Sequence, residues 1–84
     1  MNKFLITAII PTLELEFNIY IPNNKKIGTI KKYLLITIKE LTGDVFYKTE
    51  GTTLLLERDS GKELDSNMYV KDSGIKNGSK IIIM

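Results

Sequence analysis

Residues 13–41 read LELEFNIYIPNNKKIGTIKKYLLITIKEL, and they decide the fold because the spacing of their apolar residues changes part-way along. From Leu13 to Ile21 apolar and polar residues alternate, which predicts a strand with one buried face. Pro22, Asn23 and Asn24 end this strand, since proline has no N–H group for a sheet ladder. The residues that follow have a different period and predict a different element.

That second element is a helix. Five apolar residues are spaced 3, 4, 4 and 3 positions apart and form one stripe along it: Ile27, Ile30, Leu34, Ile38 and Leu41. Gly43 follows closely enough to serve as a C-cap residue with positive φ. The run LLITI within the segment is β-branched and could form a strand, but the length of the segment and its spaced stripe favour a helix.

Strands are also predicted on both sides of this stretch. Residues 3–10 (KFLITAII) join the alternating strand through a turn at Pro11-Thr12, so they predict the first arm of a hairpin and not a signal peptide. Further strands are predicted at residues 52–58 (TTLLLER), 62–64 (KEL, a brief one) and 79–84 (SKIIIM). We expect the intervening loops to be anchored by apolar side chains, which are Val45 or Phe46 in the first loop and Val70 and Ile75 in the second.

This order of elements predicts an α+β fold in one domain, residues 1–84. A chain this short buries both the inner face of the hairpin and the helix stripe most simply by laying the helix across one face of a mixed sheet. The helix provides the crossover that a parallel pairing of the first and last strands requires, and the last strand then lies between two others. The expected architecture is a β-grasp roll, ββαββ(β).

Residues 54–84, LLLERDSGKELDSNMYVKDSGIKNGSKIIIM, resemble the second half of ubiquitin-like domains. The resemblance lies in the Gly-Lys turn, the buried Leu64, the segment Val70-Lys71-Asp72, then Ile75 and the turn at Gly78. Ubiquitin has a tyrosine just after that aspartate, whereas this chain has Ser73-Gly74, and DSGIKNGSKIIIM is similar to the YukD-type ubiquitin-like proteins of bacterial type VII secretion systems. The resemblance implies a bacterial protein with an accessory or regulatory role in type VII secretion.

The composition argues against catalysis and against several kinds of ligand. The chain has no cysteine, histidine or tryptophan, only Arg58 as arginine, and a net charge of +2, so we expect no enzyme activity, no cofactor and no nucleic-acid partner. Clustered carboxylates at Glu57, Asp59, Glu63 and Asp65 lack the spacing of a calcium loop and indicate surface turns instead of a metal site. With no signal peptide and no apolar run of about 18 residues, the protein is expected to stay in the cytoplasm without inserting into a membrane.

The end of the chain bears on whether the protein is conjugated. Modifiers and sulfur carriers of this fold need a flexible tail that ends in Gly-Gly, whereas this sequence ends with Met84 in its most hydrophobic run. We therefore expect a protein-binding module that is not conjugated. The alternative is a covalent modifier or sulfur carrier whose tail is missing from this chain.

One sheet face is a candidate docking surface for a protein partner. In an alternating strand Ile81 and Ile83 are expected to face inward, which leaves Ile82 and Met84 facing outward. If Ile10 and Leu13 pair across a two-residue turn, Leu5 and Ile9 also face outward, whereas a slip by one residue would expose Phe4 and Ile6. With Leu54 and Leu56 placed inward, the candidate partner-binding residues are Leu5, Leu55, Ile82 and Met84.

The outer side of the helix is a second candidate surface, and the sheet face itself has other interpretations. Lys32, Ile36 and Lys39 fall on the outer side of the predicted helix, where they could meet an acidic partner, although a solvated lysine face explains them better. The apolar sheet residues could instead be scattered surface side chains. Homodimerisation through the same apolar face, or through the edge of the second strand, is a further possibility.

Overall fold

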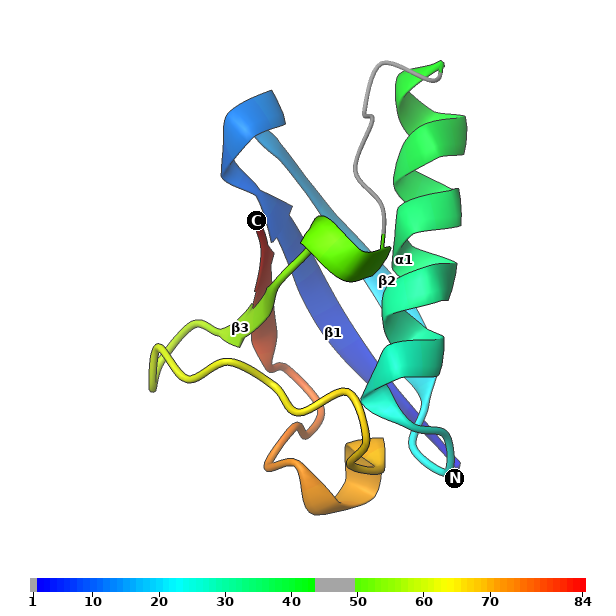
Figure 1. The fold of residues 1–84 in the computed structure, drawn as a ribbon, viewed down its shortest axis with the longest axis vertical. Coiled ribbons are helices and arrows are strands. Elements are labelled where there is room, and N and C mark those ends of the chain that lie inside the picture. The colour runs from blue at the N-terminus through cyan, green and yellow to red at the C-terminus, as the bar shows by residue number, and fades with distance from the viewer. Residues whose placement is uncertain (1, 44–49) are drawn as a thin grey trace.

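The computed structural model describes residues 2–43 and 50–84, and its main elements are one helix and a four-stranded sheet (Figure 1). The helix and strands, in chain order, are β1 (Lys3–Ile10), β2 (Leu15–Pro22), α1 (Ile27–Thr42), β3 (Leu55–Glu57) and β4 (Lys80–Ile83). Short 3-10 helices occur at Pro11–Leu13, Glu50–Thr52 and Val70–Asp72.

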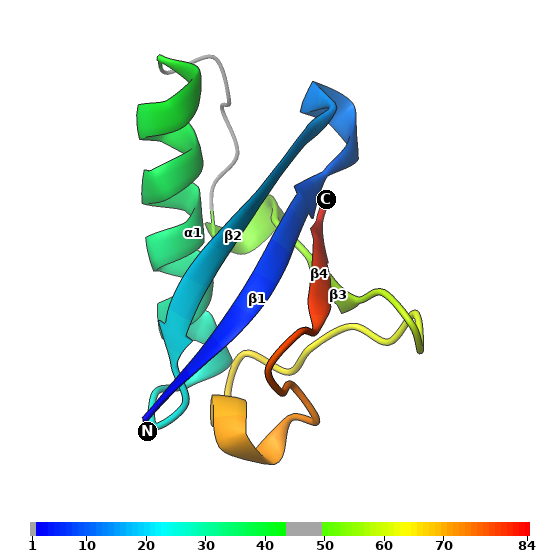
Figure 2. The same cartoon turned by 180° about the vertical axis from the view of Figure 1, so that it is seen from behind.

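The sheet order is β2-β1-β4-β3, with β4 parallel to β1 and antiparallel to β3 (Figure 2). The closing strand therefore lies between two others, as predicted from the α1 crossover. This confirms the expected α+β arrangement of one helix on a mixed sheet.

The hairpin turn between β1 and β2 is longer than expected. Ile10 pairs with Leu15 and not with Leu13, because the turn includes the 3-10 helix and Glu14, whose φ is 49°. Leu13 and Leu15 lie on the same side of an alternating strand. A shift of two residues in the pairing therefore leaves the inward and outward side chains of β1 unchanged. Ile6 is 1% exposed, and the slipped register that would expose it is wrong.

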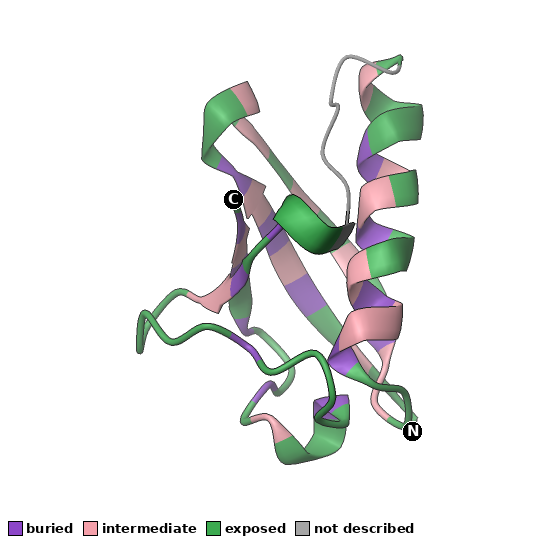
Figure 3. Ribbon diagram, viewed as in Figure 1, coloured by how far each residue is buried: buried purple, intermediate pink, exposed green. Residues whose placement is uncertain are grey.

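The core lies between the sheet and the stripe of α1, which is buried at four positions: Ile27, Ile30, Leu34 and Ile38 (Figure 3). Leu41, predicted as the fifth, is 57% exposed, and that prediction is wrong. The strands and the helix diverge toward the C-terminal end of α1, so none of the described strands lies opposite its last turn (Figure 1). Gly43 caps the helix as predicted, with φ 62° and its N–H donating to the Lys39 carbonyl.

The side chains of β3 point in the opposite directions to those predicted. Leu55 pairs with Ile83 and is 2% exposed, so its expected outward position is wrong. Cross-strand partners share a face, and Ile83 points into the core; Leu55 must therefore do the same. Leu54 and Leu56 consequently point outward.

The loops of the second half pack largely as predicted. Val70 and Ile75 are buried anchors and Leu64 is buried, whereas residues 62–64 form only an isolated bridge, Glu63 with Leu56. Val45 and Phe46, the predicted anchors of the first loop, lie outside the described residues.

The start of α1 depends on a distant loop. Lys26 provides no side-chain cap, and the N–H groups of Ile27 and Gly28 donate to the carbonyls of Met68 (2.8 Å) and Ser66 (2.9 Å). These bonds satisfy donors that every helix start leaves open. They also fix residues 66–68 against the helix, beside the bridge between Lys26 and Tyr69.

Candidate protein-docking surface

The sheet face opposite α1 carries a row of apolar side chains that crosses three strands. Ile82 of β4 is paired with Ile9 of β1 on one side and with Leu56 of β3 on the other. All three side chains are half-buried, while the apolar residues next to them along the strands, Ile81 and Leu55 among them, point into the core. The register of three strands, and not one segment of sequence, brings this row together.

A second pair extends the row toward the end of β4. The N–H of Leu54 donates to the Met84 carbonyl (2.9 Å), and the N–H of Met84 donates to the Leu54 carbonyl (3.0 Å). The two side chains are 44% and 50% exposed. We refer to the five residues together as the outer patch: Ile9, Leu54, Leu56, Ile82 and Met84.

Polar side chains border the outer patch. Thr7 and Lys80 form the next row, and the Thr7 hydroxyl donates to Asn18 Oδ1 (2.8 Å). Glu16 lies beside Ile9 on β2. An apolar centre with a polar rim is the usual anatomy of a protein-docking site.

Of the four predicted partner-binding residues, Ile82 and Met84 lie in the outer patch. Leu5 also faces outward, but it pairs with Tyr20 beyond the polar row and is separate from the patch. Leu55 is in the core, as described above. Leu54, Leu56 and Ile9 lie in the outer patch instead. Ile9 was predicted to face outward from a pairing of Ile10 with Leu13, which gives β1 the same orientation as the observed pairing with Leu15. The two leucines were assigned to the wrong face.

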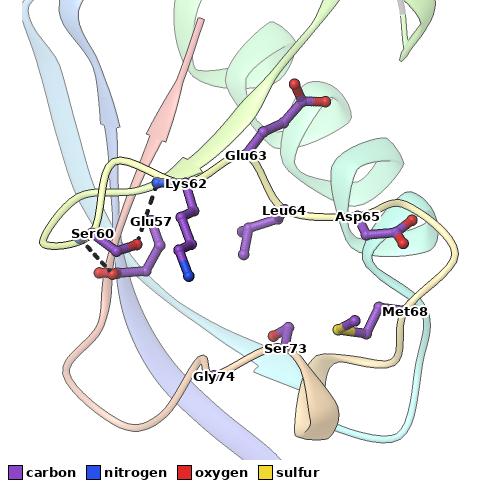
Figure 4. A pocket seen from close by; sticks show the side chains of 9 residues that line it. All are labelled: Glu57, Ser60, Lys62, Glu63, Leu64, Asp65, Met68, Ser73 and Gly74. Atoms are coloured by element: carbon purple, nitrogen blue, oxygen red, sulfur yellow. Dashed lines mark hydrogen bonds between the residues drawn. The ribbon is translucent and has the colours of Figure 1, made fainter.

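A cleft of about 410 Å³ lies between the 57–68 segment and residues 73–74 (Figure 4). Leu64 and Met68 give it an apolar part, and its other lining residues are Glu57, Ser60, Lys62, Glu63, Asp65, Ser73 and Gly74. The polar groups hold the surrounding turns: Ser73 Oγ donates to the Val70 carbonyl (2.7 Å), and the Ser60 N–H donates to Glu57 Oε1 (3.0 Å). We therefore interpret this cleft as part of the loop framework.

Glu57 accepts two hydrogen bonds from the backbone of that framework. Its carboxylate accepts the N–H groups of Asp59 and Ser60, both at 3.0 Å. These hydrogen bonds, that of Asp59 first, lower the pKa of Glu57 below its ordinary value of 4.5. The ionised form is thus favoured in the folded protein.

This lowered pKa leads to a pH prediction. A carboxyl group whose pKa is lowered by folding stabilises the protein above its unfolded pKa, and that contribution is lost as the pH falls through the folded value. Glu57→Gln should therefore be slightly less stable than wild type at pH 7, and the two should converge in acid. Urea unfolding at pH 7 and pH 3 measures this, and an unchanged difference between the two pH values would contradict it.

Comparison with known proteins identifies the architecture. No protein-family model matches the sequence, and no curated protein is significantly similar to it. Among solved structures, the ubiquitin-like domain of an Arabidopsis thaliana protein matches with a TM-score of 0.75 and 20% identity, over 100% of this chain and 78% of that one. The ubiquitin of Caldiarchaeum subterraneum matches with a TM-score of 0.74 and 15% identity, over 96% of this chain and 90% of that one. The chain has the ubiquitin-like β-grasp fold.

A third similar structure is part of a larger protein. A chain of the MycP5-free ESX-5 inner membrane complex matches with a TM-score of 0.79 and 12% identity, over 100% of this chain and 21% of that one. At these identities the likeness to all three structures establishes the ubiquitin-like fold alone.

The other predicted surface of this ubiquitin-like fold lies on α1. Lys32, Ile36 and Lys39 are exposed on the side of the helix away from the sheet. Ile36 is the only apolar residue of the three, and the exposed Tyr33 lies one turn before it.

Two further features of the ubiquitin-like chain concern metals and membranes. Within residues 2–43 and 50–84, no group of three or more acidic, histidine or cysteine side chains is placed to hold a metal ion. In the same ranges no helix is long and apolar enough to cross a bilayer; α1 has 16 residues.

Proposed function

We propose that this protein is a non-enzymatic, ubiquitin-like protein-binding module that acts in the cytoplasm as an accessory or regulatory component of type VII secretion. The outer patch is the binding surface in this proposal, and its occupant is a folded component of the secretion machinery. The proposal treats the protein as an adaptor that contributes a rigid surface and no chemistry.

The observation that carries the binding role is the outer patch itself. Its residues come from three hydrogen-bonded strands, so their side chains are held in place before any partner arrives, which lowers the entropic cost of binding. Ile82 lies on the strand between β1 and β3, at the centre of the row. Central, half-buried apolar side chains inside a polar rim are where binding energy concentrates.

The secretion role has two supports. Residues 72–84, DSGIKNGSKIIIM, are similar to YukD-type proteins of type VII secretion systems. A domain of the same fold also occurs in a chain of the ESX-5 inner membrane complex. The partner we propose is accordingly a membrane-associated component of such a machinery, recognised through its own apolar surface.

Ile82→Asp tests the binding role. The aspartate would place a charge at the centre of the contact, and we expect the affinity for the partner to fall by about 30-fold or more. The measurement is affinity capture from native lysate of the source organism, with the retained proteins identified by mass spectrometry. The same substitution at Ile36, which is 51% exposed on the far side of α1, is the matched control.

Circular dichroism verifies that both variants are folded before the capture is compared. The proposal is supported when secretion components bind wild type and Ile36→Asp but not Ile82→Asp. Retention of the same secretion components by a folded Ile82→Asp variant would remove the outer patch as the docking site, and capture of no secretion component by wild type would remove the type VII role.

A further inference from the structure

The outer strand β2 has an open edge that differs from the other edge of the sheet. β2 is eight residues long and ends the sheet order beside β1 (Figure 2). At the opposite edge β3 has three residues, and its outer side is paired: the Leu64 N–H donates to the Leu55 carbonyl (2.8 Å) and the Glu57 N–H to the Lys62 carbonyl (2.9 Å). In the described part of the chain no segment pairs with β2 in this way.

The hydrogen-bond register shows which backbone groups of β2 are available. The Asn23 N–H donates to the Asn2 carbonyl (2.8 Å), which makes these residues a hydrogen-bonded pair. Such pairs recur at every second residue of an antiparallel ladder, so the backbone groups of Phe17 and Ile19 point toward β1. The N–H and C=O groups at the alternate positions therefore point away from the sheet; these are Glu16, Asn18 and Tyr20.

In β2 the usual protection against strand pairing is limited to the charge of Glu16 and to Pro22 at the end of the strand. Natural edge strands are blunted by proline, lysine, bulges or covering segments. Its central positions, from Phe17 to Ile21, contain neither proline nor a charged residue, so the middle of the edge is open to pairing. Phe17 and Ile19 are half-buried on the inner face, so part of each side chain is left for a neighbouring strand to cover.

The charges at the two ends of β2 indicate what this neighbour is. Glu14 and Glu16 are exposed at the start of the strand, and Lys25 and Lys26 are exposed just beyond its end. A second copy of the strand in antiparallel orientation places the acidic end of each copy beside the basic end of the other. With Asn18 facing Asn18 of the second copy, Glu16 faces Tyr20 and Phe17 faces Ile19, so no like charges are opposed.

We propose that the edge of β2 is a homodimerisation surface, on which two copies pair β2 to β2 around Asn18 to form one continuous sheet. The outward N–H and C=O groups of Asn18 bond reciprocally across the two-fold axis, and those of Glu16 and Tyr20 bond on either side. The outer patch lies on β1, β3 and β4 and remains accessible in this dimer, so the proposal is independent of the proposed partner binding.

A charge-swap experiment tests the dimer and its register together. Asn18→Lys opposes two lysines at the two-fold axis and Asn18→Glu opposes two glutamates, and each should weaken dimerisation by about tenfold. An equimolar mixture of the two variants opposes lysine with glutamate and should restore the dimer. Sedimentation velocity of the full chain over a range of concentrations measures all three samples, and circular dichroism verifies their folding.

Two control variants distinguish pairing at the β2 edge from a lost internal hydrogen bond and from contact through the outer patch. Both Asn18 variants lose the hydrogen bond that Asn18 accepts from Thr7. Thr7→Val removes this bond without placing a charge on the edge, and it should dimerise as wild type does. Ile82→Asp tests the outer patch as a rival dimer interface and should also dimerise. The proposal would be overturned if wild type were monomeric at millimolar concentration. It would also be overturned if Ile82→Asp lost the dimer while Asn18→Lys kept it, or if the mixture of Asn18→Lys and Asn18→Glu stayed monomeric.

Discussion

Leu55→Asp is expected to leave the protein largely unfolded at 25 °C. Leu55 is 2% exposed, and its neighbour Ile83 belongs to the same core. The aspartate would lose the burial of the leucine and place a carboxylate among apolar side chains, at a cost of about 4 kcal/mol or more. A chain of 84 residues has a total stability of about 4–13 kcal/mol. Far-ultraviolet circular dichroism and a proton–nitrogen correlation spectrum measure the loss.

Leu56→Asp is the matched control, since it makes the same change one residue further on. Leu56 faces outward, half-buried, next to Ile82. We expect this variant to stay folded, with a loss of about 1 kcal/mol. If Leu55→Asp were folded and Leu56→Asp were not, the inward facing of Leu55 on β3 would be wrong.

A chain that ends at Lys80 is expected to have no stable fold. The deletion removes Ile81 and Ile83 from the core, each worth about 1.5–3 kcal/mol. It also removes most of β4, which connects β1 to β3, and leaves the inner edges of both without a partner. The loss exceeds what a small domain can tolerate. A collapsed proton–nitrogen correlation spectrum is the expected result.

Removal of Met84 alone is the control for this deletion. Met84 shares two backbone hydrogen bonds with Leu54, and its side chain is half exposed, so we expect a cost of about 1–3 kcal/mol and a protein that remains folded. A well-dispersed spectrum for the chain ending at Lys80 would show that β4 is dispensable and would contradict the central position of that strand.

The elements that could be predicted from the sequence are those with an unambiguous period. The alternation up to Ile21 and the stripe from Ile27 to Ile38 each have one arrangement that buries their apolar residues. The order of these elements then limits the sheet topology, and the position of β4 was predicted correctly. The ubiquitin-like resemblance of residues 54–84 indicated the same architecture.

The facing of Leu54-Leu55-Leu56 could not be predicted from its own residues. Every position in that run is leucine, so alternation gives no preference, and pairing with Ile83 decides the question. The error at Leu41 has another origin, because a periodic sequence does not show where the opposing sheet ends. The outer patch was therefore only partly predicted: it depends on the register between strands that are distant in sequence.

The central position of β4 also determines when this protein can fold during its synthesis. Of the four strands, β4 is the last to leave the ribosome, although β1 and β3 are joined only through it. The nascent chain therefore leaves one edge of β1 and one edge of β3 without a partner until β4 has left the ribosome. The pairing of β4 with β1 and β3 must form after that point, in a step that brings together residues from opposite ends of the polypeptide. Until then the emerging chain is a substrate for chaperones and proteases.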